Sequence, residues 1–355
     1  MSDRTARRLR IALITGGSTP ERDVALAGAG EVLRALRVAG HEVTAVDTVH
    51  GALGPEQEGQ FLALRVGRKP PGDEELAQAR EREDVPGLLR LKAVSGADLA
   101  FLVLHGLDGE GGLLQAVLEL GGLPYTGSGV LASALAMEKA SAKRVLQGAG
   151  IPTPRFEMLE FQTPEDLRNG IESLGAPVVV KPSRVGSSVG LRIAHGFDDV
   201  CSAVAEARWH DRCVLVEEML PGREFTVGVV GAPDGIGLEP LGVGEIVTGS
   251  GLFDYQAKYT PGIAEELFPA DIPESLAGEL RELTVETHRA LGLRDFSRVD
   301  FRLDANGEPS VLEANTLPGM TTRSLLPQSA AVMGISFPAL CDRIARLAAT
   351  RSGAR

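Results

Sequence analysis

Six lysines stand among the 36 basic residues of this chain, and the other basic residues are arginines. Lys181 ends the apolar run APVVVK and is followed at once by SRVGSSVG. Small residues let backbone N–H groups approach an anion, and a lysine adds a compact positive charge. The stretch therefore favours phosphate binding. It is not a Walker A loop, because the chain has no Gly-Lys pair.

A second group of polar residues ends the apolar stretch VLEAN. Residues two apart in a strand share a face, so Glu313 and Asn315 project together, and Val311 is expected on their side. Arg298 and Asp300 share a face of the preceding strand, and the DANGE turn suits an antiparallel hairpin. If the hairpin pairs these faces, the converging oxygen atoms suit Mg²⁺. The alternative is a surface hairpin with solvated acids.

Other residues give weaker signals. His105 ends the apolar run ADLAFLVLHG, and α/β proteins bind ligands at the carboxyl ends of parallel strands. A lone histidine there is most often structural, although nearby glycines and Glu110 strengthen a functional interpretation. Lys139 and Lys258 lie in MEKAS and DYQAKY, and each alone is typical of a surface lysine. The run GSGVLA matches a dinucleotide-binding pattern, but no convincing strand precedes it.

The composition restricts the class of protein. Apolar residues make up 43% and charged residues 24%, which is typical of a soluble globular protein, and no apolar run approaches the ~20 residues of a membrane span. The net charge of −12 disfavours nucleic acid and anionic membranes as partners. The three cysteines have no CxxC spacing, which suggests a reducing, cytoplasmic location, and the histidines show no zinc-ligand spacing.

The elements that must position these residues alternate at first between strand and helix. Strands are expected at 9–17, 41–48 and 97–106, with helices at 18–40 and 112–122. This alternation indicates a parallel α/β domain at the N-terminus. Ser18 or Thr19 is expected to cap the first helix, and Gly40 to end it. Residues 51–95 are expected to form a solvated loop with one helix around 73–83.

The remainder of the chain reads as two further segments. A helix is expected over 133–150, and residues 176–194 read as strand, glycine-rich turn and strand. The hairpin described above and a C-terminal helix complete the last segment. We therefore expect three domains, at 1–127, 128–217 and 218–355.

Seven motifs together resemble the D-alanine–D-alanine ligase family of ATP-grasp enzymes, over nearly the whole chain apart from 51–95. One of them alone would be weak, but seven in this order are specific. They are GGSTPERDVAL (16–26), LHGLDGEGGLLQ (104–115), PYTGSGVLASALAMEK (124–139), VVKPSRVGSSVG (179–190), GREFTVGVV (222–230), FDYQAKY (253–259), and RVDFRLD with LEANTLPGMT between 298 and 322.

The resemblance implies a mixed α/β (α+β) fold, namely a three-domain ATP-grasp fold with ATP held between the second and third domains. It implies that ATP and two D-alanines give D-alanyl-D-alanine, ADP and phosphate for peptidoglycan synthesis. The first carboxylate would attack the γ-phosphate, and the second amine would attack the resulting acyl phosphate. The resemblance also implies a homodimer formed through the first domain. A regulator without catalysis is the alternative from another class, and it would be expected to lack the hairpin's charged residues.

Site residues are carried over from the family by position. For ATP, the resemblance implies that Lys139 and Lys181 contact the α- and β-phosphates and that Lys258 reaches the γ-phosphate. It implies that Glu217 lies by the adenine and that Glu224 accepts hydrogen bonds from the ribose. The implied ligands of two Mg²⁺ or Mn²⁺ ions are Asp300, Glu313 and Asn315.

The resemblance implies a separate set of residues for D-alanine. Glu21 would hold the first ammonium, with His105 nearby and Ser187 linking the glycine-rich loop to Glu21. Arg298 and the backbone N–H of Gly319 would form the oxyanion site. The carboxylate of the second D-alanine would bind at Ser324. A lid is expected over 245–262, carrying Lys258.

The chain departs from the family pattern at two positions. Gly111 stands where an acid or amide is expected. Phe253 stands where most members carry a tyrosine, and in this respect the chain resembles members that make D-alanyl-D-lactate. Loss of a hydroxyl group can change how a site distinguishes an amine from a hydroxyl acceptor. A D-alanine–D-lactate ligase is therefore the alternative interpretation, and a silent replacement of tyrosine is the simpler one.

Overall fold

The structure is a computed structural model that describes residues 7–62, 66–67, 71–159, 168, 171–186, 188–232, 235–248 and 263–351. Three residues of the sequence-based predictions, Ser187, Phe253 and Lys258, lie outside these described residues. So does most of the predicted lid, of which 245–248 belongs to a strand.

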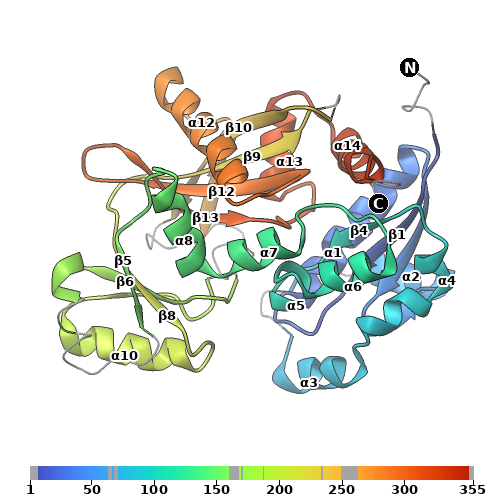
Figure 1. Cartoon of the computed structure of the whole chain (residues 1–355), viewed down its shortest axis with the longest axis horizontal. Helices are drawn as coiled ribbons and strands as arrows, with labels where there is room; N and C mark the ends of the chain where they lie inside the picture. The colour runs from blue at the N-terminus through green and yellow to red at the C-terminus, as the bar shows by residue number, and fades with distance from the viewer. Residues whose placement is uncertain are drawn as a thin grey trace.

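The N-terminal part of the chain forms a largely parallel sheet, as the sequence predicts. Its strand order is β3 (Gly51–Ala52), β2 (Glu42–Asp47), β1 (Arg10–Thr15) and β4 (Leu99–Val103). The strand β1 pairs in parallel with both β2 and β4, whereas the short β3 is antiparallel. Five of the six residues of β1 are buried, as expected for a central parallel strand. Figure 1 shows this sheet in blue at the right of the molecule.

The first helix begins later than predicted. The helix α1 runs over Arg22–Val38, and neither Ser18 nor Thr19 caps it. The preceding loop is instead held by Arg22, whose guanidinium pairs with Asp47 at 2.6 Å and donates to the Gly17 carbonyl at 2.8 Å. The residues before α1 therefore form a fixed loop that carries Glu21.

The segment 51–95 is more regular than the predicted loop. The expected helix is present as α3 (Asp73–Arg82), but α2 (Pro55–Leu62), the 3₁₀ helix η2 (Pro86–Arg90) and α4 (Lys92–Ser95) accompany it. A few apolar residues that are widely spaced in the sequence pack this segment into the apolar core of the N-terminal sheet, among them Leu53, Leu88 and Val94. Because these apolar residues are widely spaced, they show no helical periodicity, and the sequence did not predict the additional helices.

The predicted helix over 133–150 is two helices. The helices that follow β4 are α5 (Leu107–Glu110), α6 (Leu113–Gly121), α7 (Val130–Met137) and α8 (Lys139–Gly148). The chain breaks at Glu138, which has φ −87° and ψ 93° and accepts a hydrogen bond from the Ser141 N–H at 2.8 Å. The break places Lys139 at the first residue of α8.

A second sheet is antiparallel throughout. Its order is β5 (Phe156–Leu159), β8 (Val214–Glu218), β6 (Val178–Pro182) and β7 (Arg192–Ala194), and α10 (Phe197–Arg208) packs on it. The predicted order of strand, glycine-rich turn and strand is confirmed by β6 and β7. Lys181 lies near the end of β6, just before the turn.

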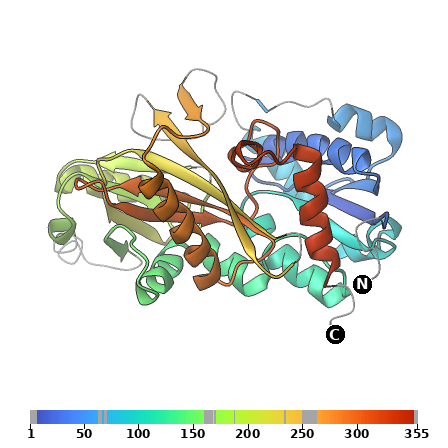
Figure 2. The same cartoon turned by 90° about the horizontal axis from the view of Figure 1, so that it is seen from above.

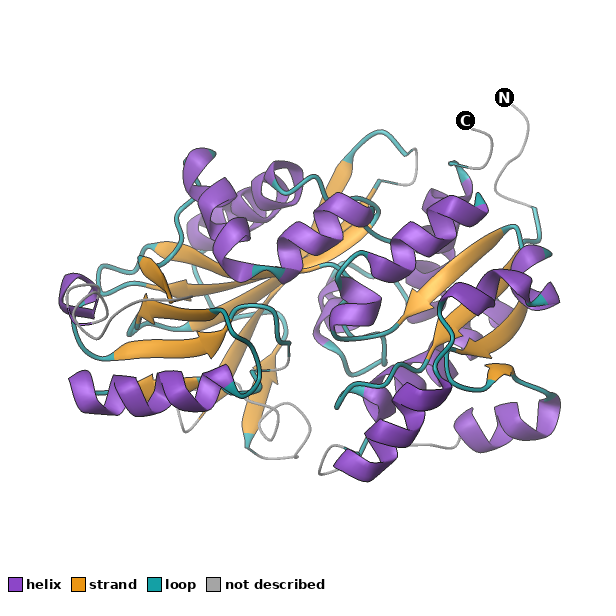
Figure 3. Cartoon of the chain, turned by 60° about the horizontal axis from the view of Figure 1, so that its bottom comes forward, coloured by secondary structure: helices purple, strands orange, loops and turns teal. Residues whose placement is uncertain are grey.

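A third antiparallel sheet carries the predicted hairpin. Its order is β11 (Ala264–Leu267), β10 (Leu238–Thr248), β9 (Glu224–Gly231), β12 (Phe296–Leu303) and β13 (Pro309–Asn315), with α12 (Glu274–Ala290) and α13 (Leu325–Val332) packed against it. Figure 3 shows the N-terminal sheet at the right, apart from the other two sheets at the left.

The hairpin contains a bulge that strict alternation does not predict. Asp300 pairs with Glu313, but the next residue of β12 pairs with Val311, so Leu312 is extra. As a result Val311 is fully buried in the core, while Leu312 and Glu313 both line a pocket. The prediction that Val311 shares the face of Glu313 and Asn315 is therefore wrong.

The last helix returns to the first sheet. The helix α14 (Phe337–Ala349) packs against α1 and β4, and the largest apolar core contains residues of all three (Figure 2). The chain segment after 218 therefore contributes to the core of the N-terminal sheet. The predicted domain boundaries stay a prediction. Within the described residues, no helix is both long enough and apolar enough to span a membrane.

Candidate active site

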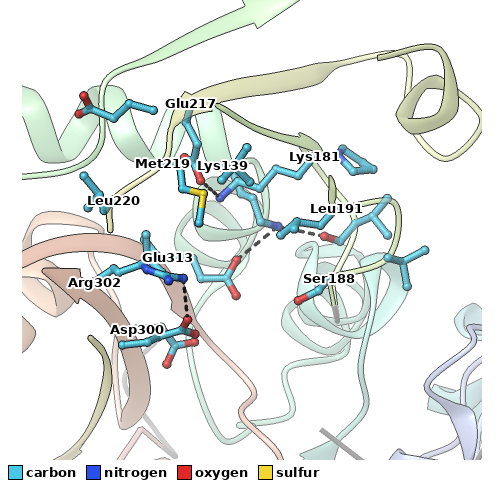
Figure 4. Close-up of a pocket in the computed structure, with 18 residues that line it drawn as sticks. Lys139, Lys181, Ser188, Leu191, Glu217, Met219, Leu220, Asp300, Arg302 and Glu313 are labelled. Carbon is cyan, nitrogen blue, oxygen red and sulfur yellow. Dashed lines mark hydrogen bonds and ion pairs between the residues drawn. The ribbon is translucent and has the colours of Figure 1, made fainter. Parts of the chain in front are cut away.

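A charged pocket lies between the second and third sheets. Charged side chains that line it and were predicted as site residues are Lys139, Lys181, Glu217, Glu224, Asp300 and Glu313. Figure 4 shows Lys139, Lys181 and Glu217 on one side of the pocket and Asp300 and Glu313 on the other. The structure therefore brings together side chains that are far apart in the sequence.

The two lysines reach the pocket because α8 is joined to the loop after β6. The Lys139 N–H donates to the Ser183 carbonyl at 3.2 Å, and the Ser183 hydroxyl donates to the Glu138 carboxylate. The Lys139 ammonium donates to the Val185 carbonyl at 2.9 Å. The helix break at Glu138 thus fixes Lys139 beside the glycine-rich turn.

Glu217 lies between two ammonium groups. Lys181 Nζ is 2.5 Å from Oε1 and Lys143 Nζ is 3.0 Å from Oε2 of this carboxylate. Burial alone would raise the pKa of Glu217, but the charges of Lys143 and Lys181 hold that pKa below its ordinary value. Sequence reasoning missed Lys143. The available signal was its rarity as a lysine and its place four residues after Lys139 on one helix.

The opposite wall carries the predicted metal ligands. Asp300 on β12 lies directly opposite Glu313 on β13 in the strand register, and the Asn315 amide donates to Asp300 at 3.0 Å. The Arg298 guanidinium donates to both oxygens of Asp300, each at 2.8 Å. Thr226, which sequence reasoning missed, donates to the same carboxylate at 2.7 Å.

This donor set fits a magnesium ion. Among the described residues, no three or more His, Cys, Asp and Glu side chains gather as a metal centre. The hairpin instead brings together two carboxylates and one carboxamide. Mg²⁺ usually takes few protein ligands and completes its shell with phosphate and water, so a small set of hard oxygen donors beside a phosphate site is what it requires.

Glu224 lies farther along the same wall. It begins β9 and lines the pocket, and Arg302 Nη1 lies 3.3 Å from its Oε2. Arg302 also lines the pocket, and sequence reasoning did not single it out. The pair places a carboxylate at the pocket edge with its charge balanced by an arginine.

A second group of predicted residues surrounds Glu110, at the end of α5. The carboxylate of Glu110 accepts a hydrogen bond from the Gly106 N–H at 2.9 Å. Burial and the nearby Glu21 carboxylate raise the pKa of Glu110 to about 8, while Arg298 opposes this. Glu21, Arg298 and Glu110 therefore lie within electrostatic reach of one another. His105 is buried just before this segment, and its carbonyl accepts a hydrogen bond from Thr19 at 3.3 Å.

Two close backbone approaches involve other predicted residues. A Cβ atom on Gly319 would lie 2.9 Å from Ser324 Oγ, so these two predicted residues are neighbours. A Cβ atom on Gly186 would lie 3.2 Å from the Glu21 carboxylate, so the glycine-rich turn reaches the loop before α1. The pair of Arg298 and Asp300 connects this group to the pocket that Asp300 lines.

Comparisons with known proteins cover almost the whole chain. Residues 10–128 match the family described as "D-ala D-ala ligase N-terminus", and residues 145–346 match "D-ala D-ala ligase C-terminus". The chain is 39% identical to the D-alanine–D-alanine ligase of Desulfotalea psychrophila, over 99% of this chain and 98% of the relative. It is 35% identical to that of Pelotomaculum thermopropionicum, over 98% and 99% of the two chains.

Solved structures agree with these sequence matches. The VanG D-Ala:D-Ser ligase from Enterococcus faecalis superposes with a TM-score of 0.78 at 29% identity, covering 96% of this chain and all of that chain. The D-alanine–D-alanine ligase from Bacillus anthracis, solved with ATP, gives a TM-score of 0.74 at 27% identity, covering 96% of this chain and 97% of that chain.

Proposed function

The chain belongs to the D-alanine–D-alanine ligase family, and we propose from this premise how its charged pocket works. The enzyme is an ATP-dependent ligase with an ATP-grasp fold. It joins two D-alanines into D-alanyl-D-alanine for peptidoglycan synthesis. The roles of individual residues, the metal ion and the assembly are our proposals.

The pocket between the second and third sheets is the proposed ATP site. One observation carries this assignment, namely that Lys139 and Lys181 face Asp300 and Glu313 across a single pocket. Phosphoryl transfer depends mainly on positioning and on neutralising phosphate charge, and lysines facing metal-binding carboxylates supply both. Glu217 would lie by the adenine and Glu224 by the ribose. Lys258 would reach the γ-phosphate.

The hairpin is the proposed magnesium site, with Asp300, Glu313 and Asn315 as ligands. Two bound Mg²⁺ or Mn²⁺ ions would neutralise charge on the phosphates during transfer. Thr226 would orient the Asp300 carboxylate. Arg298, which pairs with Asp300, would lie between the metal ligands and the reacting carboxylate of D-alanine.

The residues around Glu110 form the proposed D-alanine site. Glu21 would bind the ammonium of the first D-alanine, with His105 nearby and Ser187 holding the glycine-rich turn. The carboxylate of this D-alanine attacks the γ-phosphorus, and the bond to ADP breaks. The neutral amine of the second D-alanine then attacks the acyl phosphate, and phosphate leaves as the nitrogen loses a proton. Arg298 and the Gly319 N–H would stabilise the oxyanion, and Ser324 would bind the second carboxylate.

The identity of the acceptor is the main alternative. The comparisons give no better support to D-lactate as the second substrate, and Phe253 lies outside the described residues. A homodimer, a cytoplasmic location and domains at 1–127, 128–217 and 218–355 stay predictions.

Product analysis tests the acceptor. The protein would be incubated with ATP, Mg²⁺ and D-alanine, with and without an equal amount of D-lactate, near pH 6 and pH 8. We expect only D-alanyl-D-alanine in the mass spectrum at both pH values. If D-alanyl-D-lactate dominates, most clearly at pH 6 where the competing amine is more fully protonated, the acceptor assignment is wrong.

A further inference from the structure

Lys143 is a buried residue that contacts Glu217, a residue lining the proposed ATP site. It lies four residues after Lys139 on α8, but its side chain is only 2% exposed. Its ammonium donates to Thr153 Oγ1 at 2.7 Å and to the Pro154 carbonyl at 3.3 Å, in addition to its ion pair with Glu217. Lys143 is therefore fixed by the protein itself.

Glu217 consequently has one cation on each carboxylate oxygen. Lys181 and Glu217 line the pocket. Lys181 Nζ lies 2.5 Å from Glu217 Oε1. If Lys181 binds a phosphate of ATP, as the proposed function requires, this contact is weakened, because one ammonium group then divides its hydrogen bonds between two anions.

A buried carboxylate that loses its only cation is strongly destabilised. Lys143 removes this difficulty, because it stays ion-paired with Glu217 Oε2 while it donates hydrogen bonds to two other acceptors. We propose that Lys143 is a positioning residue, a resident partner for Glu217 that frees Lys181 to move to the phosphates when ATP binds. This inference rests on the proposed function of Lys181.

The electrostatics of the three groups support this exchange. Burial lowers the pKa of Lys143 to about 8, and the neighbouring Lys181 charge lowers it as well, against the effect of Glu217. When Lys181 moves away, that repulsion decreases and the pair of Lys143 and Glu217 becomes more favourable. The move therefore leaves a balanced pair in the interior of the protein.

Replacement of Lys143 by methionine tests the inference. In Lys143→Met the ligand-free protein keeps the pair of Lys181 and Glu217, so we expect it to fold. The Kd for ATP should rise by at least about tenfold, because binding then leaves Glu217 without a cation. The Kd for adenosine, which has no phosphates, should change less than about twofold, and kcat at saturating ATP should be nearly retained.

A second variant separates this role from simple packing. In the Glu217→Gln background, Lys143→Met should have little further effect on the Kd for ATP, because a neutral side chain needs no cation. Lys92→Met, at an exposed position on α4, is the matched control and should bind both ligands normally. Equal losses for ATP and adenosine, an unchanged Kd for ATP, or additive losses in the double variant would overturn the inference.

Lys181→Met distinguishes failure of the inference from failure of the proposed function. If Lys181 binds phosphate, this variant loses much of the preference for ATP over adenosine. If it keeps that preference, the assigned role of Lys181 is wrong and the inference fails with it. If the preference falls in Lys181→Met but persists in Lys143→Met, only the inference is wrong.

Discussion

The ammonium of Lys139 faces the carboxylate of Glu313 across the pocket, with 3.6 Å between Nζ and Oε2. The two residues come from opposite walls, the start of α8 and the strand β13. A proposed phosphate-binding lysine and a proposed metal-binding carboxylate therefore form an ion pair with each other. When ATP binds with Mg²⁺, Lys139 would exchange this carboxylate for a phosphate, and Glu313 would exchange this ammonium for the metal ion.

Replacement of Glu313 tests the metal site. Glu313→Gln keeps the size of the side chain but removes its charge, so it should raise the Mg²⁺ concentration needed for half-maximal activity. We also expect kcat to fall by about a hundredfold or more, because charge stabilisation of the transferred phosphate is lost. Titrations of activity with Mg²⁺ measure both effects. Glu308→Gln, an exposed residue in the turn of the same hairpin, is the control. Normal Mg²⁺ dependence in Glu313→Gln would remove Glu313 from the metal site.

The close approach of Gly186 to Glu21 tests the D-alanine site. A Cβ atom at residue 186 would lie 3.2 Å from the Glu21 carboxylate, so this carboxylate must shift by a few tenths of an ångström. Gly186→Ala should therefore raise KM for the first D-alanine by about tenfold, with a smaller effect on KM for ATP. Steady-state kinetics with each substrate varied in turn measures the difference. Gly278→Ala on α12, where a Cβ meets no atom within 4 Å, should leave both constants unchanged. A larger effect on ATP than on D-alanine would contradict the assignment of Glu21.

The raised pKa of Glu110 predicts a specific dependence of stability on pH. Its carboxyl group has a pKa of about 8 in the folded protein and an ordinary value of 4.5 when unfolded. Between these pH values the folded protein binds more protons than the unfolded chain, so stability falls as pH rises. Glu110→Gln removes this contribution. The free energy of unfolding of the variant should therefore fall less steeply with pH, by up to about 1.4 kcal/mol per pH unit.

Urea unfolding at several pH values between 5 and 8, without nucleotide or metal, measures this effect. The wild-type protein and Glu110→Gln are compared at each pH. Parallel curves for the two proteins would show that Glu110 is ionised normally.

The cap of α8 tests the proposed role of Lys139 in ATP binding. Glu138→Ala removes the hydrogen bonds from the Ser141 N–H and the Ser183 hydroxyl. It should lower the free energy of unfolding by about 1 kcal/mol and also raise KM for ATP, because Lys139 follows directly. Ser336→Ala removes the cap of α14 and serves as the control, because none of the residues that line the pocket belongs to α14. It should destabilise the protein without changing KM for ATP. An equal effect of both variants on KM would argue against a positioning role for Glu138.

The parts of the site that lie within one hairpin or one turn could be predicted from the sequence. The pairing of β12 with β13 and the placement of Lys181 before a glycine-rich turn follow from local patterns. The bulge at Leu312 could not be predicted, because it depends on the pairing register and not on residue types. For the same reason Val311 was placed on the wrong face.

Contacts between distant segments were also beyond sequence reasoning. The pair of Lys143 and Glu217 joins α8 to β8, and the pair of Arg22 and Asp47 fixes the loop that carries Glu21. Neither pair has a short-range pattern. The break at Glu138 was missed because the flanking residues all favour helix, and only its capping contact with Ser141 marks the new helix start.

Transfer of an isotope from D-alanine to phosphate tests most directly whether this pocket activates the first D-alanine as an acyl phosphate. D-Alanine labelled with ¹⁸O in its carboxylate would be incubated with the protein, ATP and Mg²⁺, and the products analysed by mass spectrometry. We predict D-alanyl-D-alanine and one labelled oxygen in each phosphate released, because the attacking carboxylate oxygen leaves with the phosphate. Dipeptide formed together with unlabelled phosphate, or ADP released without dipeptide, would contradict this mechanism.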